Sequence, residues 1–202
     1  MNRKIAWIAA LCASLISGCG GARPNKYYQL TVPGDLTPAA DRNPYPVTLL
    51  IAPLRSSHLY REDHLVYSSP KENMGTYQYE RWDEPPTEML REVLLRRLRA
   101  SGRYRNVDIL RSNSHGDYIL YGNLYDFKEI DQAARVSRLT LDLELREART
   151  GSIVWTHYYT HDETAEGKDI TAVIAALDRN AQGAAGQVQS SLDQYFSTHP
   201  AN

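Results

Sequence analysis

Residues 136–148 carry the pattern that most restricts how this chain of 202 residues can fold. Apolar and polar side chains alternate there, with leucine at four positions: Leu139, Leu141, Leu143 and Leu145. Successive side chains of a strand point to opposite faces, so the alternation predicts a strand with one buried and one solvated face, as in antiparallel sheets. The turn at 149–151 and the run at 153–159 predict that the chain returns as a hairpin.

Shorter strands are predicted by runs rich in β-branched and aromatic residues. These runs are residues 26–32, 47–52, 65–68, 76–81, 107–110 and 118–127. Proline and glycine separate them, and residues 70–75 have the composition of a second hairpin turn.

Two later segments place apolar residues at helical spacing. The first follows Asp83, which we expect to cap the helix, and it ends before Gly102. Its four arginines, at 91, 96, 97 and 99, favour a solvated face over an anionic-lipid patch. The second starts after Asp169 and carries an apolar stripe to Tyr195, for which core packing is favoured over an exposed partner surface. We therefore predict an α+β two-layer sandwich: a mainly antiparallel sheet, with room for one parallel pair, and two principal helices on one face.

The net charge and the positions of the cysteines argue against a nucleic-acid-binding protein and against a disulfide-stabilised domain. The net charge is −1 for the whole chain, and without residues 1–18 it becomes −3, with 21 basic against 24 acidic residues. Nothing in this balance favours nucleic-acid binding. Both cysteines, Cys12 and Cys19, lie near the N-terminus, so the following domain has no disulfide to form and depends on packing.

The N-terminal residues have the features of a secretory signal. Two basic residues precede an apolar run at 5–16, which is shorter than the roughly 20 residues of a membrane-spanning helix. The tetrapeptide Ile16-Ser17-Gly18-Cys19 then resembles the bacterial lipobox. This resemblance implies cleavage before Cys19, a diacylglycerol on its sulfur and a further acyl chain such as palmitate on its amine. Gly20, where aspartate would signal inner-membrane retention, implies the periplasmic face of the outer membrane. An ordinary signal peptide with a chance cysteine is the alternative.

Motifs that would indicate catalysis are absent from the sequence. It contains no G-x-S-x-G, P-loop, H-E-x-x-H or C-x-x-C pattern, and its six histidines are scattered. We predict a binding or assembly module that is not an enzyme and has no metal or cofactor beyond the lipid. A lipid-anchored hydrolase using Asp63 and His64 beside Ser56 and Ser57 is the alternative, although adjacency in sequence is poor evidence of a triad's geometry.

Four stretches, in order, resemble one family. Lys26-Tyr27-Tyr28-Gln29-Leu30 follows the lipobox closely, and residues 47–54 resemble the family's second strand. Residues 77–86 resemble its approach to the first helix. Residues 173–181 resemble its terminal helix, with Asp178 where asparagine is usual. The family is that of the ABC-type transport auxiliary lipoproteins, the PqiC-like group, and the resemblance covers essentially the whole mature chain.

The resemblance implies a function that composition does not show. Such lipoproteins accompany a periplasmic MCE-domain protein and its inner-membrane transporter, which move phospholipid or other hydrophobic molecules between membranes and support envelope integrity. This chain would be the outer-membrane docking subunit, without transport chemistry of its own. A regulator of an inner-membrane envelope-synthesis enzyme is the alternative. Cargo and oligomeric state stay open, with a homo-oligomer among the options.

The predicted organisation is a signal at 1–18, a lipidated tether at 19–25, one domain at 26–197 and a disordered tail at 198–202. From Cys19 to Lys26 the chain reaches at most about 25 Å, and severalfold further if the fold begins only at residue 47. We favour the short reach. Aromatic residues are favoured at interfaces, and five are candidates for partner binding: Tyr27, Tyr28, Tyr77, Tyr79 and Trp82. For Trp82 a position in the core is the better interpretation, because it would bury a large area.

Overall fold

Strand β7 (Tyr118–Ile130) is the element around which the sheet is built. One of its edges pairs antiparallel with β8 (Val136–Glu147) from Tyr118 to Ile130. The other edge is shared by three short strands, all parallel to β7. These are β2 (Tyr45–Ile51), β3 (Arg55–Ser56) and β4 (His64–Ser68). The structure is a computed structural model, and it describes residues 23–32, 44–69, 73–132 and 134–199.

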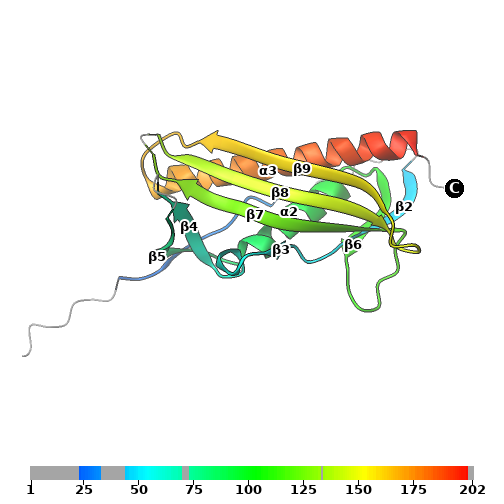
Figure 1. The fold of residues 1–202 in the computed structure, drawn as a ribbon, viewed down its shortest axis with the longest axis horizontal. Helices are drawn as coiled ribbons and strands as arrows, with labels where there is room; N and C mark the ends of the chain where they lie inside the picture. The colour runs from blue at the N-terminus through cyan, green and yellow to red at the C-terminus, as the bar shows by residue number, and fades with distance from the viewer. Residues whose placement is uncertain (1–22, 33–43, 70–72, 133, 200–202) are drawn as a thin grey trace, which may run out of the picture.

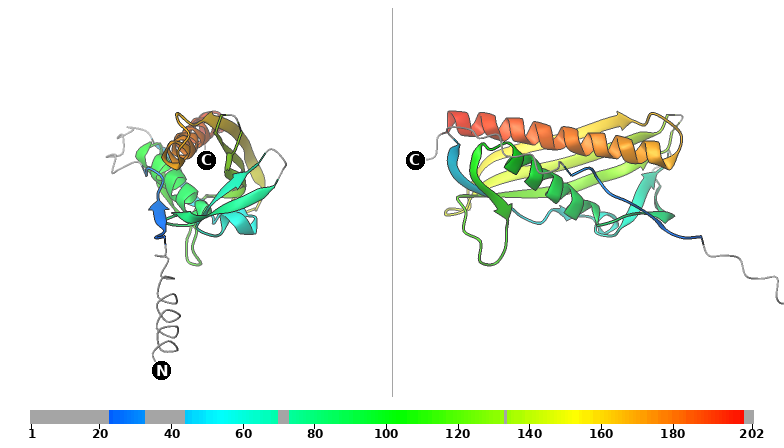
Figure 2. Two further views of the ribbon diagram at one scale, coloured as in Figure 1. Left: turned by 90° about the vertical axis from the view of Figure 1, so that its left-hand side faces the viewer. Right: turned by 180° about the vertical axis from the view of Figure 1, so that it is seen from behind.

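Further strands extend the sheet on both sides of β7. Strand β9 (Ile153–Thr164) pairs with β8, β6 (Tyr104–Ile109) with β2, and β5 (Met74–Trp82) with β4. The N-terminal strand β1 (Lys26–Tyr28) lies parallel to β5. A short 3-10 helix, η1 (His58–Tyr60), connects β3 to β4. The two α-helices, α2 (Pro86–Ala100) and α3 (Ile170–Thr198), cover one face of this sheet (Figures 1 and 2).

The α+β sandwich predicted from the sequence is confirmed, and so is the β8–β9 hairpin. The alternating leucines of β8 are at most 1% exposed, and Gly151 adopts a φ of 74° in the turn, where a residue without Cβ is unstrained. Parallel pairing is more extensive than the single pair expected, since β1, β2, β3 and β4 all take part in it. The alternation of apolar residues shows which face of a strand is buried, but it does not show whether the neighbouring strand runs parallel or antiparallel.

The expected cap of the first helix is wrong. Asp83 does not cap α2, because Pro85 occupies the N-cap position without a side-chain hydrogen bond and Pro86 is the first helical residue. A proline at position 86 keeps Pro85 in extended backbone, so the helix begins two residues later than Asp83 requires. The backbone N–H of Asp83 instead donates to the carbonyl of Tyr28 at 2.7 Å. At the other end, Gly102 follows the helix with a φ of 64°, as predicted.

Helix α3 packs its apolar stripe into the core, which confirms the favoured interpretation of this segment. Asp169 caps it by accepting a hydrogen bond from the Ala172 N–H at 2.8 Å. The stripe is interrupted by one polar residue, Asn180, which is 1% exposed. Its amide accepts from the Tyr159 hydroxyl at 2.8 Å and donates to the His161 carbonyl at 2.9 Å. These bonds compensate the desolvation of the amide and fix the helix against β9.

Helix α3 also gives the domain its length. Its 29 residues correspond to about 43 Å at 1.5 Å per residue. It runs from the end of the molecule that holds β1, β4 and β5 to the opposite end, where β2 begins and the chain finishes (Figure 1). We refer to these as the N-terminal end and the far end. Among the described residues, no helix is both long and apolar enough to cross a membrane.

Candidate functional site

Glu80 is the carboxylate on which the N-terminal segment converges. It lies on β5 opposite Lys26 of β1 and is 7% exposed. The Tyr28 hydroxyl donates to its Oε2 at 2.7 Å, while Arg23 and Lys26 lie 3.7 and 3.6 Å from its Oε1. A buried carboxylate without such partners would be costly, so Glu80 and its partners hold β1 against the sheet. We call Arg23, Lys26, Tyr28 and Glu80 the Glu80 clasp.

Arg23 is the earliest residue of the chain that the clasp holds against the domain. Its guanidinium lies over the ring of Tyr79, 5.4 Å from the centroid, a geometry in which the cation is attracted to the ring. Arg23 is only four residues after Cys19. Four residues span at most about 14 Å when fully extended, which is shorter than the reach predicted from Lys26.

After β1 the chain crosses from the sheet edge to helix α3. Leu30 is 3% exposed, and the Thr31 backbone makes two bonds with α3 side chains. Its N–H donates to Asp178 Oδ1 at 2.8 Å, and its carbonyl accepts from Gln182 Nε2 at 2.5 Å. The segment predicted to be one strand is therefore a three-residue strand followed by a stretch attached to α3. Asp178, the departure from the usual asparagine, is one of the residues that attach it.

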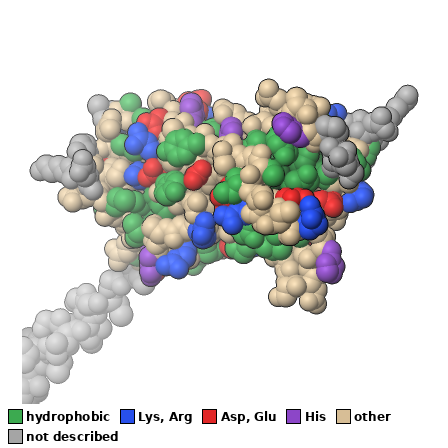
Figure 3. All heavy atoms as spheres, turned by 45° about the vertical axis from the view of Figure 1, so that its right-hand side comes forward, with side chains coloured by type: hydrophobic (Ala, Val, Ile, Leu, Met, Phe, Trp, Pro, Cys, Tyr) green, Lys and Arg blue, Asp and Glu red, His purple; other side chains and the backbone are tan. Residues whose placement is uncertain are grey.

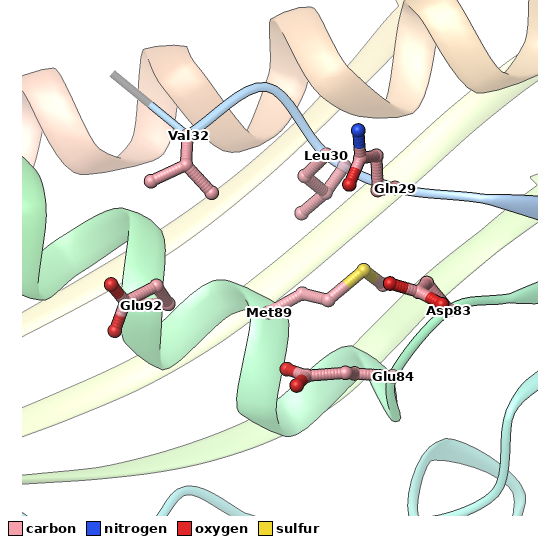
Figure 4. A pocket seen from close by; sticks show the side chains of 7 residues that line it. All are labelled: Gln29, Leu30, Val32, Asp83, Glu84, Met89 and Glu92. Atoms are coloured by element: carbon pink, nitrogen blue, oxygen red, sulfur yellow. The ribbon is translucent and has the colours of Figure 1, made fainter. Parts of the chain in front are cut away.

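A hollow of about 200 Å³ lies between this segment and the start of α2 (Figure 4). Its lining residues are Gln29, Leu30, Val32, Asp83, Glu84, Met89 and Glu92. The Met89 side chain lies between the N-terminal segment on one side and Glu84 on the other. This hollow is smaller than the roughly 300–1,000 Å³ of typical ligand pockets, and acidic side chains line it. It does not fit a phospholipid.

A second, open hollow lies over α3 and is lined mostly by polar residues, among them Arg97, His157, Gln187 and Ser190. Acyl chains require apolar walls, so this surface does not fit a phospholipid either.

The structure brings the four candidate tyrosines together on β1 and β5 but gives them different environments. Tyr27 is 58% exposed. The Tyr28 hydroxyl instead donates a hydrogen bond to Glu80 at 2.7 Å, and the Tyr77 hydroxyl donates one to Glu129 at 2.6 Å. The ring of Tyr79 lies under Arg23. Tyr27 is therefore the one of these four with an exposed ring available to a partner.

The fifth candidate, Trp82, lies in the core. It is 1% exposed, and its ring centroid is 5.3 Å from that of Phe127. This agrees with the interpretation that burial of its large side chain stabilises the domain. Cys19 lies outside the described residues.

Comparison with known proteins identifies the family. A family model described as the ABC-type transport auxiliary lipoprotein component matches residues 28–189. The chain belongs to this auxiliary lipoprotein family. Protein XCC0632 from Xanthomonas campestris shares the fold with a TM-score of 0.74 and 18% identity, over 86% of this chain and 98% of that chain. A second solved structure, of an uncharacterized protein, shares the fold with a TM-score of 0.66 and 12% identity, over 84% of this chain and 99% of that chain. No curated protein matches the sequence.

As a member of this family the protein is an auxiliary component of ABC-type transport and a lipoprotein of the cell envelope. The match begins at Tyr28, so the clasp tyrosine and the whole of β5 lie within the family's own domain. It ends at residue 189, before the last turns of α3, which extends to Thr198, one residue beyond the predicted domain boundary.

The other sequence candidates have structural partners. Three of the α2 arginines contact acids: Arg91 pairs with Glu88, Arg96 with Glu92 at 2.6 Å and Arg99 with Asp108 at 3.1 Å. The fourth, Arg97, donates to Gln189 at 2.8 Å. This pairing supports a solvated face more than a lipid-binding patch.

The proposed hydrolytic residues do not form a relay in the described structure. His64 Nδ1 lies 3.4 Å from Glu62 and 3.6 Å from Asp63, while the carboxylate of Asp63 also accepts from Arg81 at 2.7 Å. The Ser56 hydroxyl donates to the carbonyl of Ser57. Within the described residues, no group of three or more potential metal ligands was found.

A second aromatic cluster at the far end was missed by sequence analysis. Its members are Tyr45, Tyr104, Tyr118, Tyr195 and Phe196, whose neighbouring ring centroids lie 5.1–5.9 Å apart. They come from β2, β6, β7 and α3, so no local period connects them. The Tyr104 hydroxyl donates to Asp193 Oδ1 at 2.7 Å, and burial is the main reason that its pKa lies above the ordinary value. This cluster fixes the end of α3 to the sheet.

The clasp predicts a measurable loss of stability at alkaline pH. Burial first, and then the bond to Glu80, raise the pKa of Tyr28 from 10.0 to about 12. A raised folded-state pKa means that the stabilisation is complete below pH 10 and is lost as the pH rises through about 12. We expect Tyr28→Phe to reduce the pH dependence of the urea midpoint in this window, while Tyr27→Phe keeps it. Equal profiles for both variants would contradict this role.

Proposed function

We propose that this lipoprotein is anchored through Cys19 to the periplasmic face of the outer membrane and docks the MCE-domain protein of an intermembrane lipid transport system. The family match supports the auxiliary role and the lipidated envelope location. The signal sequence supports Cys19 as the lipidated residue, and Gly20 supports the outer membrane. The MCE-domain partner is inferred from the family resemblance.

The observation that carries the docking role is the short reach of the anchor. The clasp orders the chain from Arg23, so about 14 Å of extended chain at most separates the fold from Cys19. The domain itself extends about 43 Å along α3. Anchored in this way, the domain stays at its own membrane, and a transporter from the opposite membrane must reach it. A long tether would have favoured the regulator of an inner-membrane enzyme.

We propose that the domain contributes by binding a partner and performs no chemistry of its own. Neither of the two hollows described above fits a phospholipid, because one is small and acidic and the other open and polar. In the hydrolase alternative, the aspartate accepts a hydrogen bond from Arg81 and the histidine lies nearer to Glu62 than to Asp63. These observations support a contribution by binding.

Photo-crosslinking in living cells tests the docking role. We expect a crosslinker at Ile153 or Tyr158, which are 52% and 63% exposed on β9, to capture the MCE-domain protein encoded with the same transporter. The control is a crosslinker at Val188, which is 0% exposed and should capture nothing. Capture of a cell-wall synthase in place of the MCE-domain protein would favour the regulator alternative.

A further inference from the structure

We infer that the surface formed by Arg23, Lys26, Tyr27 and Met74 rests on the anionic headgroups of the protein's own membrane. We call it the membrane-proximal surface. The inference rests on the proposed anchoring at Cys19 and adds to it which surface of the domain faces the bilayer. Its support comes from chain length, strand direction, charge and exposure.

Chain length places Arg23 close to the headgroups. The lipidated cysteine would sit at the membrane surface, and Arg23 follows it by at most about 14 Å. The headgroup layer is itself roughly 5–8 Å thick on each side of the hydrocarbon core. The Arg23 side chain is 60% exposed, and together with its own length the short connection brings its guanidinium within reach of lipid phosphates.

Strand direction adds Met74 to this surface. Because β1 runs parallel to β5 with Lys26 opposite Glu80, the chain before Lys26 leads back along β5 toward its first residue. That residue, Met74, is 43% exposed and lies six residues, about 20 Å, before Glu80 along β5. The chain therefore points toward its anchor at the N-terminal end of the domain, where the described chain begins in Figure 1.

Charge and side-chain type at this surface suit a lipid headgroup layer. Arg23 and Lys26 share one carboxylate, Glu80, so the three groups together carry a net charge of +1. The Lys26 side chain is 56% exposed despite this contact. A basic residue near an anionic membrane is attracted to its surface, and exposed tyrosine is typical of the membrane–water interface. Figure 3 shows basic side chains at several places on one face of the molecule, among them its lower left.

The turn between β8 and β9, at the far end of the domain, should lie away from the membrane. The turn between β8 and β9 contains Arg149, whose side chain is 83% exposed, and precedes Ile153, which is 52% exposed. It adjoins the start of β7, whereas Met74 pairs with Ser68 beside the end of β7, so the 13 residues of β7 separate the turn from the Met74 side of the membrane-proximal surface by about 40 Å. In the proposed orientation the headgroups lie beyond the reach of this turn.

Site-specific quenching tests the orientation on the full lipidated protein. Cleavage removes Cys12 and lipidation blocks Cys19, so Tyr27→Cys and Ile153→Cys each introduce a unique free thiol for a fluorophore. The protein is incorporated into vesicles of phosphatidylethanolamine and phosphatidylglycerol containing a nitroxide-headgroup lipid. We expect quenching at position 27 to exceed that at position 153 severalfold.

The role of charge is tested first without changing the residues of the clasp. Replacing phosphatidylglycerol by phosphatidylcholine removes the negative charge of the lipid surface. Raising the salt from about 0.1 M to about 1 M shortens the range of the electrostatic attraction. Either change should reduce quenching at position 27. Arg23→Gln with Lys26→Gln should reduce it likewise, whereas Arg149→Gln should leave it unchanged.

The outcomes separate this inference from the proposed anchoring. Stable vesicle association with equal quenching at both positions, or with no dependence on anionic lipid, would overturn the membrane-proximal surface and leave the anchor intact. Failure of the processed protein to associate with vesicles would overturn both.

Discussion

Cys19→Ala should yield a folded protein that no longer fractionates with membranes and that fails to complement a deletion strain. Each methylene of an acyl chain buried in the bilayer contributes about 0.8 kcal/mol, and stable anchoring requires more than one chain. The variant loses all of these chains at once. Folding should be unaffected, since the buried apolar residues of the described domain begin at Leu30 and end at Phe196.

The measurement combines membrane flotation, a thermal melt and an assay of envelope integrity in the deletion strain. A soluble Cys19→Ala protein that complements fully would refute the docking role. Ser57→Ala and His64→Ala serve as matched controls, because they should remain at the membrane and complement. Loss of complementation by these two variants, with anchoring intact, would instead support the hydrolase alternative.

A substitution at position 20 should change the membrane to which the protein is sorted without removing its lipid anchor. Gly20→Asp is expected to retain the lipidated protein at the inner membrane, where the short reach from Cys19 to Arg23 keeps it away from an outer-membrane docking position. Membrane fractions separated by density should show the transfer, and complementation should fall to the level of Cys19→Ala. Gly20→Ser controls for the loss of the glycine. Full activity of Gly20→Asp at the inner membrane would contradict docking at the outer membrane.

Long elements were predictable because their period is repeated many times. The alternation of β8 and the stripe of α3 each extend over a dozen residues or more, and the structure places both as expected. The two-residue strand β3 has no period of its own, and it exists because β7 offers a free edge beside it. The direction of pairing is likewise set by the path of the chain and not by composition.

The clasp was not predictable for a different reason. In the alternation of β5, Glu80 lies between Tyr79 and Arg81 and has the composition of a solvated position. Its burial depends on Tyr28, which is 52 residues away in the sequence. The same separation connects Tyr77 to Glu129. Local composition therefore identified the tyrosines of this end but not the carboxylates that fix two of them, and it could not separate Tyr27 from the others.

Glu129 connects the N-terminal end of the domain to the central strand. It lies on β7, is 1% exposed and accepts from the Tyr77 hydroxyl at 2.6 Å, so it joins β5 to β7 across the intervening β4. Arg135, whose side chain is 28% exposed, supplies the compensating charge, with Nη1 3.1 Å from Glu129 Oε1. Burial, and then the bond to Glu129, hold the pKa of Tyr77 above its usual value, so the hydroxyl remains a donor at neutral pH.

We expect Arg135→Ala to reduce the free energy of unfolding by about 3–5 kcal/mol, because it leaves a buried carboxylate without a cation. Arg138→Ala is the matched control, since Arg138 pairs with Asp162 at 2.7 Å between side chains that are 39% and 45% exposed. An exposed pair of this kind contributes about 0–1 kcal/mol. Urea denaturation compares the two variants, and equal losses would contradict a special role for Glu129.

Hydrogen exchange then shows whether the loss is local. In Arg135→Ala the amides of β1 and β5 should exchange faster relative to those of α3, whose Asn180 and Tyr159 contacts lie outside the Glu129 network. If β1 detaches, Arg23 is no longer held by the domain, and a longer stretch of chain then connects Cys19 to the first residue that is. The variant should then retain its membrane anchor but lose the preferential quenching at position 27. Uniform acceleration across β1, β5 and α3 would instead show that Glu129 stabilises the domain as a whole.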